Sequence, residues 1–126
     1  EEHKALKKAI YKRYQEGLSE LSEIILNPLN PQGDANCWLT AMWIKEESPV
    51  TPDAVMDALE EQNIECRPIW KPMHLQPVFA EYDFISEAGD RASAIFNRGL
   101  CLPSDIKNTE EDMDKIIGIV RKCFGK

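Results

Sequence analysis

The longest near-continuous apolar stretch in the chain reads Cys37-Trp38-Leu39-Thr40-Ala41-Met42-Trp43-Ile44. It has the length of a β-strand and falls far short of the ~20 residues that a membrane-spanning helix needs. Because apolar and polar residues do not alternate along it, we expect both faces to be covered, by this domain or by another one. In a strand the side chains divide into two sets, Cys37, Leu39, Ala41 and Trp43 on one face and Trp38, Met42 and Ile44 on the other.

Helical patterns lie on both sides of this strand. Residues 2–25 are predicted to form a long helix, because apolar residues recur at intervals of three or four with charges between them. A second helix is expected to begin at Thr51-Pro52-Asp53, where threonine supplies the N-cap and proline occupies the first helical position. Both helices would pack an apolar stripe against the strand.

Two more helices are expected in the second half of the chain. One covers residues 86–97, with Ala92, Ile95 and Phe96 facing inward. The other begins at Thr109-Glu110-Glu111-Asp112, which resembles a capping box with Asp in place of Glu. Its apolar residues have the clearest 3.6-residue period in the chain: Met113, Ile116, Ile117, Val120, Cys123 and Phe124.

Short strands and loops fill the remaining segments. Residues 27–36 contain two prolines and a glycine and are predicted to form a loop. Residues 64–69 and 100–103 predict short strands, and residues 71–81 an ordered loop. The order of these elements predicts an α/β fold of two layers, in which helices pack on a small sheet of three or four short strands.

Composition excludes several classes of function. The chain has 126 residues, with 15 Lys and Arg against 22 Asp and Glu, and a net charge of −7. This acidic balance argues against nucleic-acid binding and against attachment to an anionic membrane, since both need clustered basic residues. The start, Glu1-Glu2-His3-Lys4, does not resemble a signal peptide, so we expect a soluble, cytoplasmic protein.

The cysteines Cys37, Cys66, Cys101 and Cys123 include no C-x-x-C pair. Structural zinc sites place ligands in such close pairs, so we expect no metal site. Apolar neighbours around each cysteine favour reduced, buried thiols, although their number alone would allow disulfides.

The most chemically distinctive stretch is Arg67-Pro68-Ile69-Trp70-Lys71-Pro72-Met73-His74-Leu75-Gln76. Its prolines reduce the entropy lost when a binding loop is ordered, and its arginine, lysine and histidine can contact a carboxylate or phosphate. Two interpretations remain open. The stretch is either a binding loop for an anionic small molecule, or a surface crossover. In the second case Trp70 and Met73 would pin it to the core while Arg67 and Lys71 pair with carboxylates.

This stretch, continued to Phe79, and the segment Asn97-Arg98-Gly99-Leu100-Cys101-Leu102-Pro103-Ser104 resemble the C-terminal part of the DegT-type sugar aminotransferases. The block Lys71-Pro72-Met73-His74-Leu75-Gln76 is the specific part of a resemblance that spans nearly the whole chain. It is most similar to members that aminate a UDP-linked 4-keto-6-deoxy-N-acetyl sugar, of the bacillosamine or pilin-glycosylation type. The resemblance implies a fold-type I, pyridoxal-phosphate-dependent enzyme that transfers an amino group from an amino acid, usually glutamate, to a nucleotide-linked keto-sugar.

The resemblance also implies the place of this chain in such an enzyme. The chain corresponds to the small C-terminal domain, whose short, mostly antiparallel sheet carries helices. We expect residues 1–25 to be a connecting helix from a missing large domain and residues 26–126 to be the small domain. The family's cofactor lysine lies in the large domain, and no lysine here matches its context. We therefore expect no catalytic residue, no bound pyridoxal phosphate and no activity in the isolated chain.

In the complete enzyme, which the resemblance implies is a homodimer, the loop would face the nucleotide-sugar substrate. The expected substrate-binding residues are Lys71 on the diphosphate or sugar oxygens, His74 as a polar sugar contact, Trp70 and Met73 as apolar walls, Gln76 behind them, and Arg67. The alternatives are a free-standing α/β module that binds a small anion or regulates a partner, and a purely structural domain.

Overall fold

The computed structural model describes residues 1–87 and 89–126, and a four-stranded antiparallel sheet lies at its centre. Its strands are, in spatial order, β1 (Ile24–Leu26), β2 (Thr40–Ile44), β4 (Gly99–Leu102) and β3 (Arg67–Pro68). The two central strands pair with Thr40 opposite Leu102. The sheet confirms the predicted α/β class and the predicted short, antiparallel strands.

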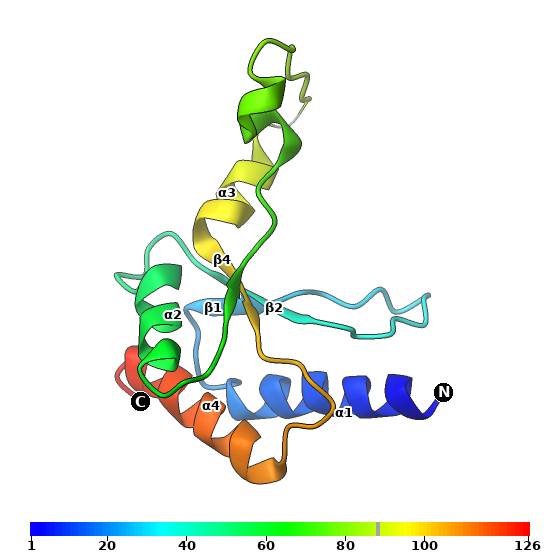
Figure 1. Ribbon diagram of the computed structural model, residues 1–126, viewed down its shortest axis with the longest axis vertical. Helices are drawn as coiled ribbons and strands as arrows, with labels where there is room; N and C mark the ends of the chain where they lie inside the picture. The colour runs from blue at the N-terminus through cyan, green and yellow to red at the C-terminus, as the bar shows by residue number, and fades with distance from the viewer. Residues whose placement is uncertain (88) are drawn as a thin grey trace.

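Helices form a second layer on one face of this sheet (Figure 1). They are α1 (Glu2–Gly17), α2 (Pro52–Glu60) and α4 (Glu110–Cys123). Their apolar stripes meet the central strands in a hydrophobic core, whose most deeply buried members include Tyr14, Met42, Ile44, Leu59, Leu100 and Val120. Within the described residues, no helix combines the length and the apolar character needed to cross a membrane.

Helices α2 and α4 begin where the sequence predicts. The Thr51 side chain accepts a hydrogen bond from Ala54 N at 3.2 Å, with a proline in the first turn. At α4 the capping box is complete, because Thr109 Oγ1 accepts from Asp112 N at 3.1 Å and Asp112 Oδ2 accepts from Thr109 N at 2.9 Å. These side chains bind amide groups that have no partner inside the helix.

The prediction of one helix over residues 2–25 is wrong in its last third. α1 ends at Gly17, and Ile24–Leu26 forms β1 instead. A Cβ on Gly17 would lie 2.7 Å from Ile117 Cδ1, so this glycine lets α4 approach the end of α1 closely. Leu18 and Leu21 still enter the core after the helix has ended, which is why the apolar spacing continues past its last turn.

The apolar stretch over residues 37–44 is a strand only from Thr40 onwards. Met42 and Ile44 are buried beneath the helices as one set, whereas Ala41 and Trp43 on the opposite face are only half-buried. The expectation that both faces are covered is therefore wrong for the described residues taken alone. Coverage by another domain stays a prediction.

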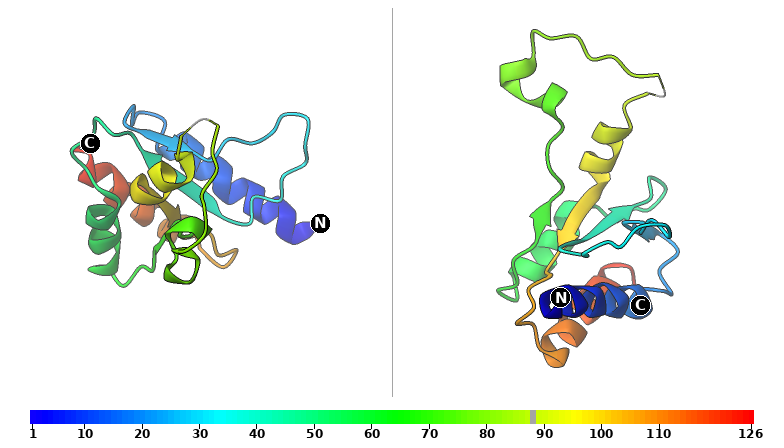
Figure 2. Two further views of the ribbon diagram at one scale, coloured as in Figure 1. Left: turned by 90° about the horizontal axis from the view of Figure 1, so that it is seen from above. Right: turned by 90° about the vertical axis from the view of Figure 1, so that its right-hand side faces the viewer.

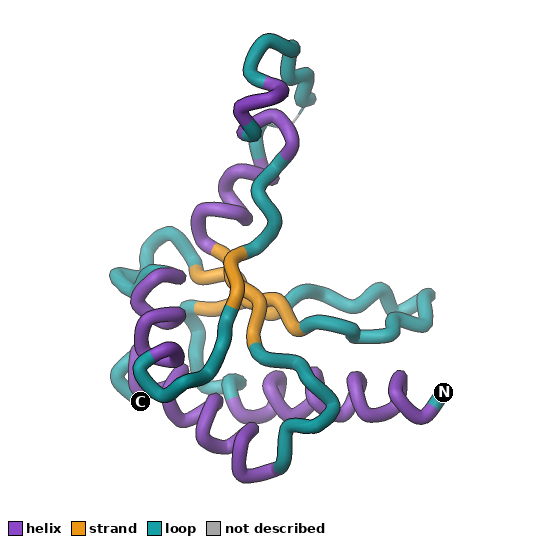
Figure 3. The backbone as a smooth tube through the Cα atoms, in the orientation of Figure 1, coloured by secondary structure: helices purple, strands orange, loops and turns teal. Residues whose placement is uncertain are grey.

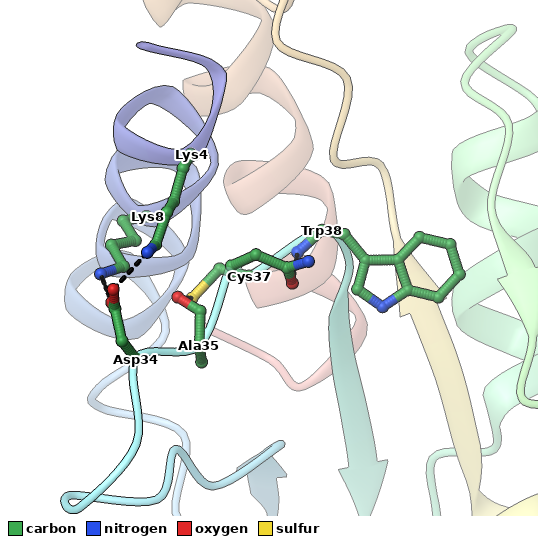
Figure 4. A network of polar contacts seen from close by, with 7 residues as sticks. Lys4, Lys8, Asp34, Ala35, Cys37 and Trp38 are labelled. Carbon is green, nitrogen blue, oxygen red and sulfur yellow. Dashed lines mark hydrogen bonds and ion pairs between the residues drawn. The ribbon is translucent and has the colours of Figure 1, made fainter. Parts of the chain in front are cut away.

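The loop between β1 and β2 returns alongside α1 (Figure 4). Asp34 accepts hydrogen bonds from Lys4 and Lys8, and these two ammonium groups lower the pKa of its carboxyl to about 2. Cys37 follows in a left-handed conformation with φ 50°. The indole of Trp38 points away from this network and is 58% exposed, so neither residue continues β2.

The predicted strand over residues 64–69 shortens to Arg67–Pro68 at the edge of the sheet. Proline has no N–H to extend the ladder, and edges tolerate it for that reason. Cys66, just before it, donates from its thiol to Cys101 O at 2.9 Å, and burial raises the pKa of the thiol to about 12. The four cysteines are free, as predicted, but only Cys37 and Cys101 are fully buried.

The helix predicted over residues 86–97 is α3 (Arg91–Arg98), and Asp90 is its N-cap. Ala88, inside the predicted range, lies outside the described residues. The inward direction predicted for Ala92 and Ile95 is wrong, because both side chains are exposed. Their spacing is helical, but this helix does not lie on the sheet.

Instead, α3 belongs to a projection that we call the arm, residues 69–87 and 89–98, which rises away from the two layers (Figures 1 and 2). Its other limb is mostly loop, with short 3₁₀ turns at Met73–Leu75 and Pro77–Phe79 (Figure 3). The limbs leave the sheet through the paired strands β3 and β4. The predicted ordered loop over residues 71–81 is thus one limb of the arm.

Candidate functional site

The arm exposes an unusual share of large apolar side chains. Those at least half exposed include Trp70, Met73, Val78, Tyr82, Phe84 and Ile85. Exposed apolar surface of this kind, concentrated on a projection, is typical of a contact with another protein surface or a ligand. The arm therefore combines the distinctive sequence stretch with the most exposed apolar part of the described structure.

The structure argues against a crossover that is pinned to the core. Trp70 and Met73 are 64% and 60% exposed, so neither anchors the segment. Arg67 does pair with a carboxylate, that of Glu65, as this alternative predicts. Lys71 is exposed and forms no ion pair within the described residues. Lys71 is thus exposed and its charge is not neutralised by a carboxylate of the described residues.

A groove of about 1050 Å³ lies beside the root of the arm. Arg67, Trp70 and Lys71 line it together, and Lys115 of α4 lines it as well. Trp70 also packs against Trp38, with ring centroids 5.7 Å apart. The other predicted site residues, Met73, His74 and Gln76, lie farther along the arm and do not line this groove.

His74 joins the two limbs of the arm. Its Nε2 lies 2.7 Å from Asp90 Oδ2 and 3.1 Å from Ser93 Oγ, and its ring stacks on Phe84 with centroids 3.9 Å apart. Hydrogen bonds from the Ser93 hydroxyl and amide, and then from His74, hold the pKa of the Asp90 carboxyl below its usual range. Sequence reasoning missed these partners, although Asp90 three residues before Ser93 is a recognisable N-cap spacing.

Gln76 has a supporting position. Its Nε2 donates to the carbonyl oxygen of Lys71 at 3.3 Å and lies 3.6 Å from Met73 Sδ. The side chain therefore braces the turn that carries Lys71, and its expected place behind the contact residues stays a prediction.

Lys4, Lys7 and Lys8 of α1 do not fit a covalent anchor for pyridoxal phosphate. Lys7 Nζ donates to two backbone carbonyls, Trp38 O at 3.0 Å and Ser104 O, while Lys4 and Lys8 bind Asp34. An anchor must instead be able to lose its proton and face an enclosed cofactor. These ammonium groups join the β1–β2 loop and the end of β4 to α1.

The fold of this chain recurs in solved structures of known proteins. In a DegT DnrJ EryC1 StrS aminotransferase from Brucella abortus, a crystal structure, the fold recurs with a TM-score of 0.83 at 24% identity, over 100% of this chain and 32% of that one. The two layers, the sheet and the arm therefore recur as one part of that longer protein.

Residues 1–121 match the DegT/DnrJ/EryC1/StrS aminotransferase family, and the chain belongs to that family. It is 33% identical over 120 residues to EpsN of Bacillus subtilis (strain 168), which is named as a pyridoxal phosphate-dependent aminotransferase. It is 29% identical over 118 residues to GDP-perosamine synthase of Caulobacter vibrioides. These matches cover 94% and 93% of this chain but 30% and 31% of the relatives, so the chain spans about a third of their length.

Proposed function

We propose that this chain is the substrate-facing small domain of an aminotransferase that transfers an amino group from an amino acid, glutamate, to a nucleotide-linked keto-sugar. The observation that carries the proposal is the exposed Lys71 on the arm of a chain from this family, a lysine that no described carboxylate pairs. The name GDP-perosamine synthase supports a nucleotide sugar as the substrate class.

Five of the predicted site residues have a proposed role in this reaction. The Lys71 ammonium binds the diphosphate of the nucleotide sugar as a point charge. Trp70 and Met73, both mostly exposed, form apolar walls beside the sugar, and Gln76 holds the turn that presents them. Arg67, which also pairs with Glu65, contacts the substrate at the mouth of the groove.

The proposed assembly covers the exposed surfaces. In it, residues 1–25 connect to a large domain that carries the cofactor lysine, and residues 26–126 form the small domain. The chain alone is then inactive. The apolar arm and the half-buried face of β2 are covered by the large domain and by the second subunit of a homodimer. Their exposure in this chain supports such coverage.

We further propose a UDP-linked 4-keto-6-deoxy-N-acetyl sugar as substrate, a role in pilin glycosylation or a related glycan, and a cytoplasmic site of action. The support for the sugar is the block Lys71-Pro72-Met73-His74-Leu75-Gln76.

The test compares Lys71→Ala with Lys122→Ala in the complete gene product that carries this chain. Lys122 is likewise an exposed lysine, but it lies on α4 away from the arm. Removing a charge-assisted contact is expected to raise the KM for the keto-sugar nucleotide about 10- to 100-fold, with the KM for glutamate unchanged. Lys122→Ala should leave both constants unchanged.

A gene product that aminates no nucleotide-linked keto-sugar would refute the proposal. Binding of a nucleoside diphosphate to that same product, lost in Lys71→Ala, would then favour the free-standing anion-binding module.

A further inference from the structure

The hydrogen bonds around His74 determine which of its ring nitrogens carries a proton. Asp90 is a carboxylate, since its pKa is held below the usual range, and a carboxylate only accepts hydrogen bonds. Its Oδ2 lies 2.7 Å from His74 Nε2, so that nitrogen must donate. The single hydroxyl hydrogen of Ser93 also goes to Asp90 Oδ2. The neutral ring therefore carries its hydrogen on Nε2 and its lone pair on Nδ1.

The described residues engage one face of the ring and Nε2, and they give Nδ1 no hydrogen-bond partner. One face of the imidazole stacks on Phe84, with an angle of 20° between the ring planes. The side chain is 17% exposed, and Nδ1 has no hydrogen-bond partner within the described parts of the chain. His74 follows directly on Met73 in one 3₁₀ turn, so it belongs to the same sequence stretch as Trp70 and Lys71.

We propose that Asp90 is a positioning residue that holds His74 with Nε2–H on its carboxylate, so that Nδ1 accepts a hydrogen bond from a hydroxyl of the keto-sugar. The inference rests on the proposed function and adds the tautomer, the contacting atom and the residue that imposes both. Asp90 reaches His74 from the opposite limb, as the N-cap of α3. Substrate contact and the pairing of the two limbs thus depend on one carboxylate.

The substitution Asp90→Asn is expected to change the tautomer of His74 while it keeps the N-cap of α3. Ser93 N always donates, at 2.9 Å to Asp90 Oδ1, so the amide oxygen of Asn must take that position. The amide NH2 then faces His74 Nε2 as a donor, which requires the hydrogen to move to Nδ1. Asn is also a good N-cap, so α3 keeps its start. The substitution turns Nδ1 of His74 from an acceptor into a donor.

The experiment uses the complete gene product, labelled with 15N-histidine and observed by NMR at an alkaline pH at which imidazole is neutral. His74→Gln identifies the resonances of His74 by their loss. Asp83→Asn is the matched control, because Asp83 is an exposed carboxylate of the same arm that forms no ion pair within the described residues. Steady-state kinetics of the same variants give the KM for the keto-sugar nucleotide and for glutamate.

We expect the Nε2–H tautomer in the wild type and in Asp83→Asn, and the Nδ1–H tautomer in Asp90→Asn. We also expect about a tenfold rise in the keto-sugar KM in Asp90→Asn, with the glutamate KM and kcat within about twofold. A tautomer that Asp90→Asn does not change, or a changed tautomer with an unchanged keto-sugar KM, overturns the role of Asp90. Wild-type protein that aminates no keto-sugar overturns the proposed function and this inference together.

Discussion

The Tyr14 hydroxyl donates a hydrogen bond of 2.6 Å to the carbonyl oxygen of Pro103, 89 residues away in the chain. It connects α1 to the exit of β4, and the Tyr14 side chain is fully buried. Tyr14→Phe should lower the free energy of unfolding by about 1–3 kcal/mol, because the carbonyl loses a partner that water cannot easily replace. Urea denaturation measures this, with Tyr82→Phe, a tyrosine 73% exposed, as the control. Equal denaturation midpoints for the two variants would contradict the prediction.

Gly17 and Gly118 should respond oppositely to alanine. A Cβ on Gly17 would lie 2.7 Å from Ile117 Cδ1 and 2.9 Å from Cγ2, whereas a Cβ on Gly118 meets nothing within 4 Å. Gly17→Ala should cost about 1–2 kcal/mol through overpacking. Gly118→Ala, inside α4, should stabilise by about 0.5–1 kcal/mol through helix propensity. The same denaturation series measures both, and a Gly17→Ala variant as stable as the wild type would show that the α1–α4 contact is looser than described.

A double-mutant cycle identifies the atoms responsible for the Gly17 effect. Ile117→Val removes Cδ1, the nearest atom to the added methyl group. In the Gly17→Ala background this second substitution should cost at least about 0.5 kcal/mol less than it does alone, because it relieves the clash. Additive costs would mean that the clash with Ile117 is not the cause.

The ion pairs of Asp34 with Lys4 and Lys8 should stabilise the fold except at strongly acidic pH. Lys4 and Lys8 lower the pKa of this carboxyl from 3.8 to about 2. Since the folded value is the lower one, the pairs contribute stability above pH 3.8, and this contribution is lost as the pH falls through 2. The Tm of the wild type should therefore exceed that of Asp34→Asn at neutral pH. Plotted against pH, the two Tm curves should converge near pH 2. Curves that stay parallel across this range would exclude the pairing.

The Cys66 thiol should resist alkylation in the folded protein. Burial raises its pKa to about 12, and its hydrogen is donated to Cys101 O. Because the thiolate is the reactive form, iodoacetamide at pH about 8 should modify Cys66 only after denaturation. Peptide mass spectrometry before and after addition of urea measures this. Rapid labelling of the native protein would place Cys66 in a more open environment.

The sequence predicted those parts of the fold that depend on local chemistry. The starts of α2 and α4 follow from Thr51 and Thr109, because each cap is formed by residues within three positions of one another. The close approach of Ile117 to Gly17 joins residues a hundred positions apart, and apolar spacing does not contain that information. β1 was missed for a similar reason, since three residues become a strand only beside β2.

The sequence predicted the loop of the candidate site but not the partners of His74. Composition and proline content identified the loop, and the structure brings Arg67, Trp70 and Lys71 together at one groove. The separate environment of His74 was not predictable, since its partners come from the opposite limb of the arm. The direction of α3 was also missed, because an amphipathic pattern indicates that one side is covered but not by what.

The root of the arm has a consequence for how relatives of this chain can diversify. The arm leaves and re-enters through directly paired residues, Arg67 with Cys101 and Pro68 with Leu100, and Arg98 donates to the carbonyl oxygens of Ile44, Lys45 and Ser48. An insertion whose ends are neighbours can be lengthened, shortened or exchanged as a cassette without rearranging the scaffold. Under the proposed function, selection on substrate preference acts on this segment while the two-layer core drifts only within its packing limits.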